Sequence, residues 1–280
     1  MISNYDNKKL SIGKLGIYTI LILGCLVTLI PFLWMISTSL KPLSEVFKMP
    51  PNIIPKKFRV ENYKDVAITI PITRYFINSI IITSIITIGT LVTTILAAFA
   101  FSKFEFWGKE LVFSILIGTM IVPSEVTLIP NYITIAKLGL INTYTGLTIP
   151  WIASVVSIFL LRQFFLTVPK SLYYAAKLDG CSDFKFLLRI MVPVSKPALI
   201  TIALLRIVNS WNEFMWPLIV TNIPNMRNLP VGIMNFTTES AGNYNLMMAA
   251  STIVIMPLII VYIFTQKHII LGITKSGIKG

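Results

Sequence analysis

The sequence Val168-Pro-Lys-Ser-Leu-Tyr-Tyr-Ala-Ala-Lys-Leu-Asp-Gly-Cys-Ser-Asp183 lies between two strongly apolar segments. Pro169 suits the first turn of a helix, where the N–H that proline lacks would have no partner. Gly180 follows a run of good helix formers, at the position where a helix ends in a left-handed residue. The stretch therefore predicts a short helix over residues 171–178 that ends at an Asp-Gly break.

A second helix is predicted directly after this break. Ser182 is a suitable N-cap, and Asp183 in the first turn complements the positive end of the helix dipole. The helical pattern runs to about Ile190, and Pro193 is expected to end it. Residues 167–197 are thus expected to form a helix–break–helix loop between two apolar spans.

Two interpretations of this loop remain open. One is an amphipathic hairpin that lies on the lipid surface. The other is a knob that inserts into a groove of a partner protein. Small residues at Ala175, Ala176 and Gly180 favour the knob because they allow close backbone approach. A helix lying on lipid would more naturally present large apolar side chains there.

The composition places the chain among membrane proteins. Of its 280 residues, 55% are hydrophobic and 12% are charged, whereas a soluble domain carries about a quarter charged residues. A formal charge of +13 would suggest nucleic-acid binding in a soluble protein. Here lysine and arginine lie mostly between apolar runs, which indicates topology signals and contact with anionic lipid. Nucleic acid is therefore not an expected partner, whereas the lipid membrane is.

The sequence contains no recognisable set of catalytic or metal-binding residues. Cys25 lies in the first apolar run and Cys181 in the loop, so no disulfide is expected, and two thiols alone make no metal site. His268 has no serine–aspartate set to work with. No G-x-x-x-x-G-K-[ST] motif occurs, so the chain is not expected to hold ATP in a P-loop. We predict that the chain is not an enzyme.

Six apolar segments are each near the roughly 20 residues that cross a bilayer. They run over about 16–38, 76–101, 111–132, 146–166, 198–220 and 246–266. The first is longer than the apolar core of a signal peptide and lacks a good cleavage site, so we interpret it as an uncleaved membrane helix. The third and fifth are interrupted by polar residues and proline. The predicted fold class is an all-α polytopic membrane protein with six transmembrane helices.

The distribution of lysine and arginine between the spans indicates how the chain is oriented in the membrane. If the N-terminus is cytoplasmic, lysine and arginine are frequent in residues 1–15, 102–110, 167–197 and the C-terminal tail, and sparse in the two short outer loops. Cytoplasmic segments are typically enriched in these residues. Both termini are therefore predicted to be cytoplasmic. The extracytoplasmic loop 40–75 is itself rich in lysine, which reduces the contrast between the two sides.

The loop resembles the EAA loop of ABC-importer permeases, whose pattern is E-A-A-x-x-D-G followed further on by I-x-L-P. This chain has Tyr174-Ala-Ala-Lys-Leu-Asp-Gly180 and then Ile190-Met-Val-Pro193. Tyr174 stands where the family has Glu, and Val192 stands where it has Leu.

Other segments extend the resemblance over nearly the whole chain, and it is closest to the MalG-like permeases of carbohydrate importers. They are Pro31–Lys41, Asn78–Ser79, Ala97–Phe104, Pro123–Pro130, Gly139–Gly146, Phe159–Phe165, Trp211–Phe214 and the tail that ends at Gly280. The resemblance implies one permease domain over residues 1–280, with its core at about 76–268. It also implies the plasma (inner) membrane of a prokaryote.

By this resemblance the chain forms half of a membrane channel together with a second, homologous permease. Two ATP-binding subunits would bind inside, and an extracytoplasmic solute-binding protein would deliver the substrate. ATP and Mg would be used by the ATP-binding subunits, and this chain would bind no cofactor. The resemblance assigns coupling to the ATPase to Tyr174, Ala175, Ala176, Lys177, Leu178, Asp179, Gly180 and Cys181.

A polar cluster in the fifth span is the candidate translocation path. Its members are Asn209, Ser210, Trp211, Asn212 and Glu213. An ionisable residue at membrane depth marks a pathway by default, and aromatic faces with amides suit sugars. The alternatives are an interhelical hydrogen-bond cluster that packs the two permeases together, or a position of Glu213 near the outer interface. Glu125 in the third span has the same two interpretations.

The predicted function is that of a permease subunit of an ABC importer for a sugar or oligosaccharide. A glycerol-3-phosphate importer is the alternative and would favour cationic residues in the pore. Arg206 is the one strong candidate within a span, and we expect it near the cytoplasmic end, which favours a sugar. An ion-coupled secondary transporter is a more distant alternative, because no internal repeat is visible and the Ala-Ala-x-x-Asp-Gly loop would have no function in it. A membrane enzyme would need a catalytic set that the sequence lacks.

Overall fold

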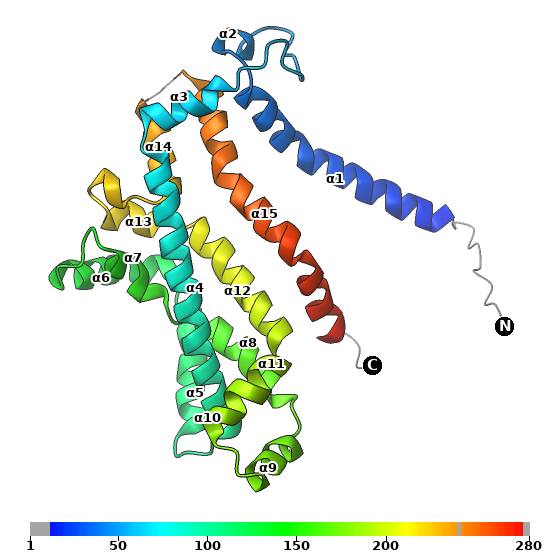
Figure 1. The fold of residues 1–280 in the computed structure, drawn as a ribbon, viewed down its shortest axis with the longest axis vertical. Helices are drawn as coiled ribbons and strands as arrows, with labels where there is room; N and C mark the ends of the chain where they lie inside the picture. Colours follow the sequence, from blue (N-terminus) through cyan, green and yellow to red (C-terminus); the bar gives the residue numbers. More distant parts are fainter. Residues whose placement is uncertain (1–11, 240–241, 277–280) are drawn as a thin grey trace. The chain divides into compact units, whose positions relative to one another are not determined.

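The computed structural model describes residues 12–239 and 242–276, and within these ranges it contains helices and no β-strand (Figure 1). In chain order the helices are α1 (Ile12–Ser39), α2 (Leu43–Val46), α3 (Glu61–Thr69), α4 (Ile72–Lys103), α5 (Lys109–Gly118), η1 (Thr119–Ile121), α6 (Ser124–Lys137), α7 (Tyr144–Thr148), η2 (Ile149–Trp151), α8 (Val155–Leu166), α9 (Lys170–Leu178), α10 (Asp183–Phe186), η3 (Leu187–Met191), α11 (Val192–Val194), α12 (Lys196–Trp211), α13 (Met215–Val220), η4 (Pro224–Met226), α14 (Leu229–Glu239) and α15 (Tyr244–Ser276).

The described chain has three helices that are long and apolar enough to cross a membrane: Gly16–Ser39, Ile72–Lys103 and Tyr244–Phe264. Three further pairs of helices pass the same test when taken together, but they are bent by 101°, 47° and 79° at short breaks. If each bent pair is one span, the total is six. The six-span prediction therefore agrees with the structure in number, although half of the spans are not straight.

The predicted third span, 111–132, is broken near its middle. The helical segment Lys109–Ile121 ends there, and α6 leaves it at an angle of 101°. Val122 is extended (φ −78°, ψ 116°) because the ring of Pro123 disfavours helical backbone in the residue before it. Pro123 therefore divides this apolar stretch into two helical segments at an angle of 101°.

The predicted fifth span, 198–220, is also not continuous. Helix α12 ends at Trp211, and α13 begins at Met215. Pro217 has no N–H to give to the carbonyl of Glu213, and that carbonyl accepts a hydrogen bond from Asn228 Nδ2 at 2.7 Å. In the structure α12 instead follows the segment Asp183–Val194 after a bend of 79°.

The predicted stop at Pro193 was wrong. The second helix of the loop begins at Asp183 as expected, passes through the π-helical segment η3 (Leu187–Met191) and continues to Val194. The wider π-type hydrogen bonds directly before Pro193 accommodate its ring and its missing N–H. The break falls two residues later, at Ser195, whose Oγ bonds to the carbonyl of Met191 at 2.7 Å.

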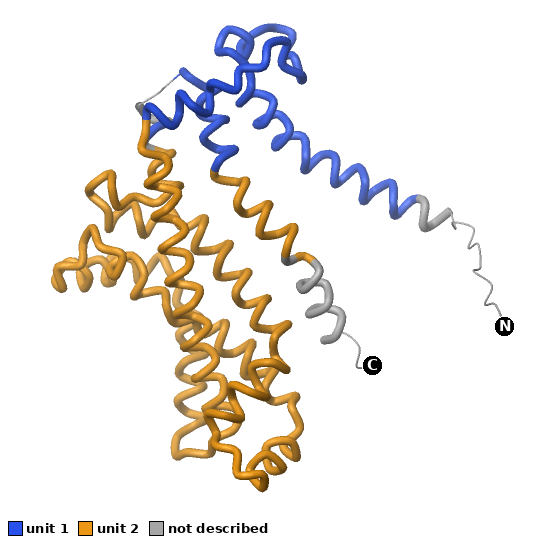
Figure 2. The backbone as a smooth tube through the Cα atoms, in the orientation of Figure 1, with its two compact units in different colours: residues 1–69, 236–253 blue, residues 70–235, 254–280 orange. Residues whose placement is uncertain are grey.

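The chain divides into two compact units (Figure 2). The first comprises residues 1–69 and 236–253, and the second comprises 70–235 and 254–280. In the first unit, the fully buried amide of Asn62 binds the end of α1: its Nδ2 donates to the carbonyls of Ser39 at 2.7 Å and Lys41 at 2.9 Å. Asn245 Nδ2 donates to Asn62 Oδ1 at 3.0 Å.

In the second unit, α4 is the central helix and packs against both α8 and α12. One face of α4 is buried along its length, from Ser79 to Ser102. A hydrophobic cluster joins α4, α8 and α12 to the loop that contains α9 and α10. Its buried members are Ala98, Phe99, Leu161, Phe165, Val168, Ala176, Phe186, Leu187, Met191 and Ile202. The loop is thus anchored on the core of this unit and positioned by it.

Candidate functional site

Helix α9 ends in a Schellman motif at Gly180. The N–H of Cys181 donates to the carbonyl of Ala176 at 2.9 Å, and the N–H of Gly180 donates to the carbonyl of Lys177 at 3.0 Å. Gly180 has φ +72°, the left-handed conformation that a residue with a side chain adopts at a cost. The predicted Asp-Gly break is therefore confirmed, and its geometry fixes where α9 stops.

The two faces of α9 differ sharply. Ala176 is buried in the cluster described above, so it anchors the helix and presents nothing to a partner. Ala175 is exposed, Tyr174 is 60% exposed and Leu178 is 89% exposed. Of the three small residues singled out in the sequence, Ala175 and Gly180 are exposed and Ala176 is not. The exposed face combines one small residue with two large apolar ones, and we call Tyr174, Ala175 and Leu178 the α9 face.

The break between α9 and α10 is held by an ion pair and a hydrogen bond. Asp183 Oδ1 accepts a hydrogen bond from Tyr173 Oη at 2.6 Å and pairs with Lys177 Nζ at 2.8 Å. The hydrogen bond to Asp183 raises the pKa of Lys177 above its usual value, with desolvation opposing it. Ser182 caps α10 by accepting the N–H of Lys185 at 3.3 Å, as predicted. These contacts hold the two short helices at a fixed angle.

A polar cavity of about 390 Å³ lies in the second unit between α4, α12 and α13. Its lining residues are Ile82, Ile86, Ser124, Leu147, Trp151, Arg206, Asn209, Ser210, Asn212, Glu213, Trp216 and Pro217. Its volume falls within the roughly 300–1,000 Å³ typical of small-molecule sites. Four members of the polar cluster predicted from the sequence line it together: Asn209, Ser210, Asn212 and Glu213.

Arg206 lines this cavity, although we expected it near the cytoplasmic end of its span. Its Nε donates to Thr90 Oγ1 at 3.2 Å and its guanidinium donates to the carbonyl of Trp151. It lies in the cavity wall with Glu213, not at the start of α12. The spacing of Arg206 and Asn209 would have placed these two on one helical face, because positions i and i+3 align. Glu213 lies in the break between α12 and α13, where helical spacing does not apply.

Two polar atoms of lining residues, Trp151 Nε1 and Ser210 Oγ, are buried without a hydrogen-bond partner among the described residues. Trp151 and Trp216 meet edge to face, with ring centroids 6.0 Å apart. The cavity thus combines aromatic surfaces with one cation, one carboxylate, two amides and spare hydrogen-bonding groups. Such a set can bind a hydroxyl-rich ligand.

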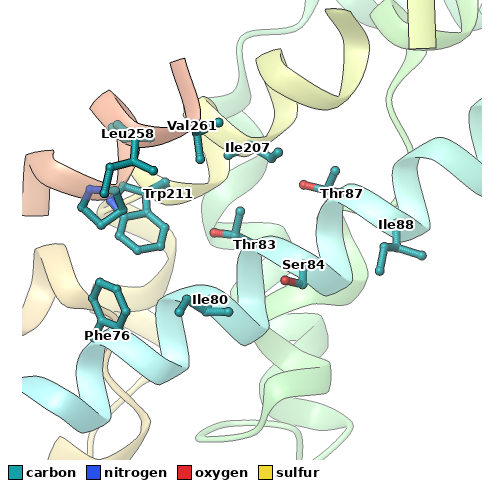
Figure 3. Close-up of a pocket in the computed structure, with 12 residues that line it drawn as sticks. Phe76, Ile80, Thr83, Ser84, Thr87, Ile88, Ile207, Trp211, Leu258 and Val261 are labelled. Carbon is teal, nitrogen blue, oxygen red and sulfur yellow. The ribbon is translucent and has the colours of Figure 1, made fainter. Parts of the chain in front are cut away.

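Trp211 lies outside this cavity. It is 5% exposed, its Nε1 donates to the carbonyl of Val254 at 3.1 Å, and its ring meets Phe76 edge to face at 5.7 Å. It lines a second, mainly apolar pocket of about 470 Å³, where Figure 3 shows it beside Phe76 and Leu258. This placement indicates that Trp211 packs helices within this chain.

Glu125 is exposed and does not line the polar cavity, although its neighbour Ser124 does. Among the residues that the structure describes, no group of histidine, cysteine, aspartate and glutamate side chains could hold a metal. The side chain of His268 lies outside the described residues.

Replacing Trp211 with alanine is expected to destabilise the protein by about 3–5 kcal/mol, as buried tryptophan-to-alanine changes do. The measurement is the thermal midpoint of the purified protein in detergent. Trp107→Ala is the control, since Trp107 is 98% exposed and its loss should leave the midpoint unchanged. Equal midpoints for the two variants, with uptake lost only in Trp211→Ala, would place Trp211 on the transport path.

Comparison with known proteins agrees with the resemblance seen in the sequence. Residues 89–275 match the family described as "Binding-protein-dependent transport system inner membrane component". The arabinooligosaccharides transport system permease protein AraQ of Bacillus subtilis is 33% identical over 273 residues, covering 96% of this chain and 97% of the relative. The sn-glycerol-3-phosphate transport system permease protein UgpE of Brucella abortus is 30% identical, covering 92% and 95%.

A solved structure shares the fold. It is the crystal structure of a bacterial ABC transporter involved in the import of the acidic polysaccharide alginate. One of its chains superposes with a TM-score of 0.83 at 24% identity, covering 95% of this chain and 99% of that one. The all-α polytopic fold predicted from the sequence is thereby confirmed.

Proposed function

Because this chain belongs to the family of binding-protein-dependent transport system inner membrane components and is a permease subunit of an ABC importer, we propose that it forms half of the membrane path for a sugar or oligosaccharide. Family membership places it in a membrane and makes a second permease and ATPase subunits its expected partners. Family membership also argues against the alternative of an ion-coupled secondary transporter.

The polar cavity is the observation that carries the substrate proposal. Its amides and the carboxylate of Glu213 suit sugar hydroxyls, and Trp151 offers an apolar face to the C–H edges of a ring, supported from behind by the buried Trp216. The relative AraQ is named for arabinooligosaccharides, which supports the same class. Asn209, Asn212 and Glu213 would provide the polar contacts, and Arg206 would hold the wall in place. Trp211 and Glu125 are not part of this set.

Glycerol-3-phosphate is a second candidate substrate, because Arg206 lines the cavity and UgpE carries that name. The guanidinium is, however, already engaged by Thr90 and Trp151, and it is attracted by the nearby carboxylate of Glu213. A phosphate would meet that carboxylate in the same cavity. A neutral polyol avoids this repulsion, so we favour a sugar.

We further propose that the loop 167–197 couples this subunit to an ATPase through the α9 face. The exposed Leu178 and Tyr174 on either side of the small Ala175 form an apolar surface, which a groove on a partner can cover. The anchoring of Ala176 in the core would carry movement of α9 into α4 and α12. Lys177, Asp179 and Cys181 flank this surface, and Gly180 sets its end.

The remaining parts of the assembly follow from the same proposal. Two ATP-binding subunits would bind and hydrolyse ATP with Mg on the cytoplasmic side, so this chain would need no cofactor. A solute-binding protein would deliver the sugar on the opposite side. Both termini would then be cytoplasmic, and residues 40–75 would face outward. The permease would act as one domain over residues 1–280.

Leu178→Asp tests the coupling surface. Because Leu178 is 89% exposed, the change should leave folding intact but place a charge in the interface, where an unpaired buried charge is strongly unfavourable. We expect the ATPase subunit to be lost when the tagged permease is purified from its membrane. Leu138→Asp is the matched control, since Leu138 is 63% exposed at the end of α6. Full recovery of the ATPase with Leu178→Asp would exclude the α9 face.

A further inference from the structure

The segment between α2 and α3 is both basic and apolar at its surface. Residues Phe47–Arg59, here called the basic apolar segment, read FKMPPNIIPKKFR and contain no acidic residue. Its exposed large apolar residues are Phe47, Met49, Ile53, Ile54 and Phe58, and each is at least 62% exposed. Within the part of the chain that the structure describes, nothing covers most of this apolar surface.

The basic apolar segment is attached to the last turn of α1. Ser37 Oγ donates to the carbonyl of Ile53, and Lys41 Nζ donates to the carbonyl of Asn52 at 2.5 Å. The N–H of Arg59 donates to the carbonyl of Leu40 at 2.8 Å. The segment therefore runs back alongside the end of the helix instead of extending away from it.

A buried charged residue stabilises this arrangement from within. Lys41 is 2% exposed, and its ammonium lies over the ring of Trp34 at 4.5 Å. Burial lowers the pKa of Lys41, and the nearby carboxylate of Glu45 partly opposes this shift. Glu45 in turn accepts the N–H of Lys56 at 2.8 Å. The loop is thus folded by its own polar contacts. Phe47 meets the ring of Tyr244 edge to face at 5.4 Å, whereas Ile53 and Ile54 stay 72% and 73% exposed.

The attachment to α1 fixes the depth of the segment. Ser37 belongs to the candidate span Gly16–Ser39, so the carbonyl that it binds lies level with the last turn of a membrane helix. Ile53 and Ile54 are 72% and 73% exposed at this level. At the boundary between acyl chains and headgroups, large apolar side chains partition into lipid.

The charge of the segment fits a lipid surface as well. Lys48, Lys56 and Lys57 are exposed and form no ion pair among the described residues, whereas Arg59 pairs with Asp65 at 2.9 Å. Lysines next to a membrane are attracted to the phosphates of anionic lipids. Apolar side chains and lysines alternate within one short segment, which is the composition of an interfacial anchor.

We infer that the basic apolar segment is a membrane-surface anchor, in which Ile53 and Ile54 enter the acyl–headgroup boundary while Lys56 and Lys57 bind the phosphates of anionic lipid. The anchor would fix the end of α1 and the fold of the first unit relative to the bilayer. It adds a lipid-binding site to the transporter that does not depend on the identity of the transported solute.

The test measures where residue 54 lies in the assembled transporter. Ile54→Cys is made in a background with Cys25 and Cys181 replaced by alanine, labelled with an NBD fluorophore and placed in nanodiscs. The discs contain phosphatidylcholine with or without a fraction of phosphatidylglycerol, and a nitroxide-labelled lipid serves as quencher. Lys64→Cys, an exposed polar position on α3, is the matched site.

We expect blue-shifted emission and quenching by shallow nitroxide at position 54, severalfold stronger than at position 64. The additional change Lys56→Gln with Lys57→Gln should remove the enhancement caused by phosphatidylglycerol, whereas Lys64→Gln should not. Equal quenching at 54 and 64, with access of iodide to both, would overturn the proposal. Shielding of position 54 that develops only when the solute-binding protein is added would also overturn it, because the segment would then bind a protein and not lipid.

Discussion

Gly180→Val is expected to reduce substrate uptake about tenfold or more, with ATP hydrolysis no longer linked to transport. A side chain in the left-handed conformation costs roughly 1–2 kcal/mol, and a β-branched residue is especially ill suited to it. Every 1.4 kcal/mol changes a population tenfold. The Schellman end of α9 would therefore open, and the α9 face would lose its fixed position. No atom lies within 4 Å of a Cβ built at Gly180, so the effect is conformational and not a clash.

The chain contains a matched control for this variant. Gly139 has φ +68°, has equally open space where a Cβ would lie, and ends α6 with the same two hydrogen bonds, from Gly139 to Ala136 and from Leu140 to Ile135. Gly139→Val should therefore cost the same conformational free energy at a position outside the loop 167–197. Uptake and ATPase rate are measured in proteoliposomes with the binding protein. If both variants transport equally well, the end of α9 has no part in coupling.

Arg206→Met should have the second large effect, a loss of uptake of about tenfold or more with the ATPase still bound. The change removes the Arg206 donor to the hydroxyl of Thr90 and one of the two donors to the carbonyl of Trp151, which still accepts from Thr90 Oγ1 at 3.2 Å. A hydrogen bond to a charged group is worth about 1.5–3 kcal/mol, so losing both should weaken this contact. The change also leaves Glu213 without the cation that attracts it. The cavity wall formed by α4, η2 and α12 should therefore loosen.

Lys137→Met removes the same charge from the exposed end of α6, outside the cavity and the loop 167–197, and should leave uptake unchanged. Arg206→Lys should restore part of the loss, because it keeps the charge but not the two separate donor directions. Uptake is measured with labelled sugar, and assembly is measured by recovery of the ATPase. Full uptake by Arg206→Met would remove the cavity from the transport path.

The parts of the fold that sequence predicted well are those fixed by local chemistry. Gly180 and Ser182 act through their own backbone and their nearest neighbours, so the break and the N-cap appear where expected. Pro193 was misjudged because its effect depends on the preceding turn, which forms π-type hydrogen bonds that a propensity argument does not anticipate.

The candidate path was predicted in part for a similar reason. Composition identified the polar stretch at the end of α12 but not the direction of each side chain. Arg206 and Asn209 lie three residues apart on one face of α12, and Glu213 lines the same cavity from just beyond the end of the helix. Trp211 lies on another face of α12 and packs against Phe76. The partners of Arg206 come from α4 and η2, far away in sequence, so only the folded chain brings them together.

The presence of both Arg206 and Glu213 in one cavity wall has an electrical consequence. Their formal charges cancel, so a neutral solute in this cavity would meet no net charge and would move none across the membrane. Each elementary charge that crosses is worth about 2.3 kcal/mol per 100 mV. By the proposed route a neutral sugar would carry no charge across the membrane, whereas a phosphorylated solute would carry its negative charge toward a negative interior.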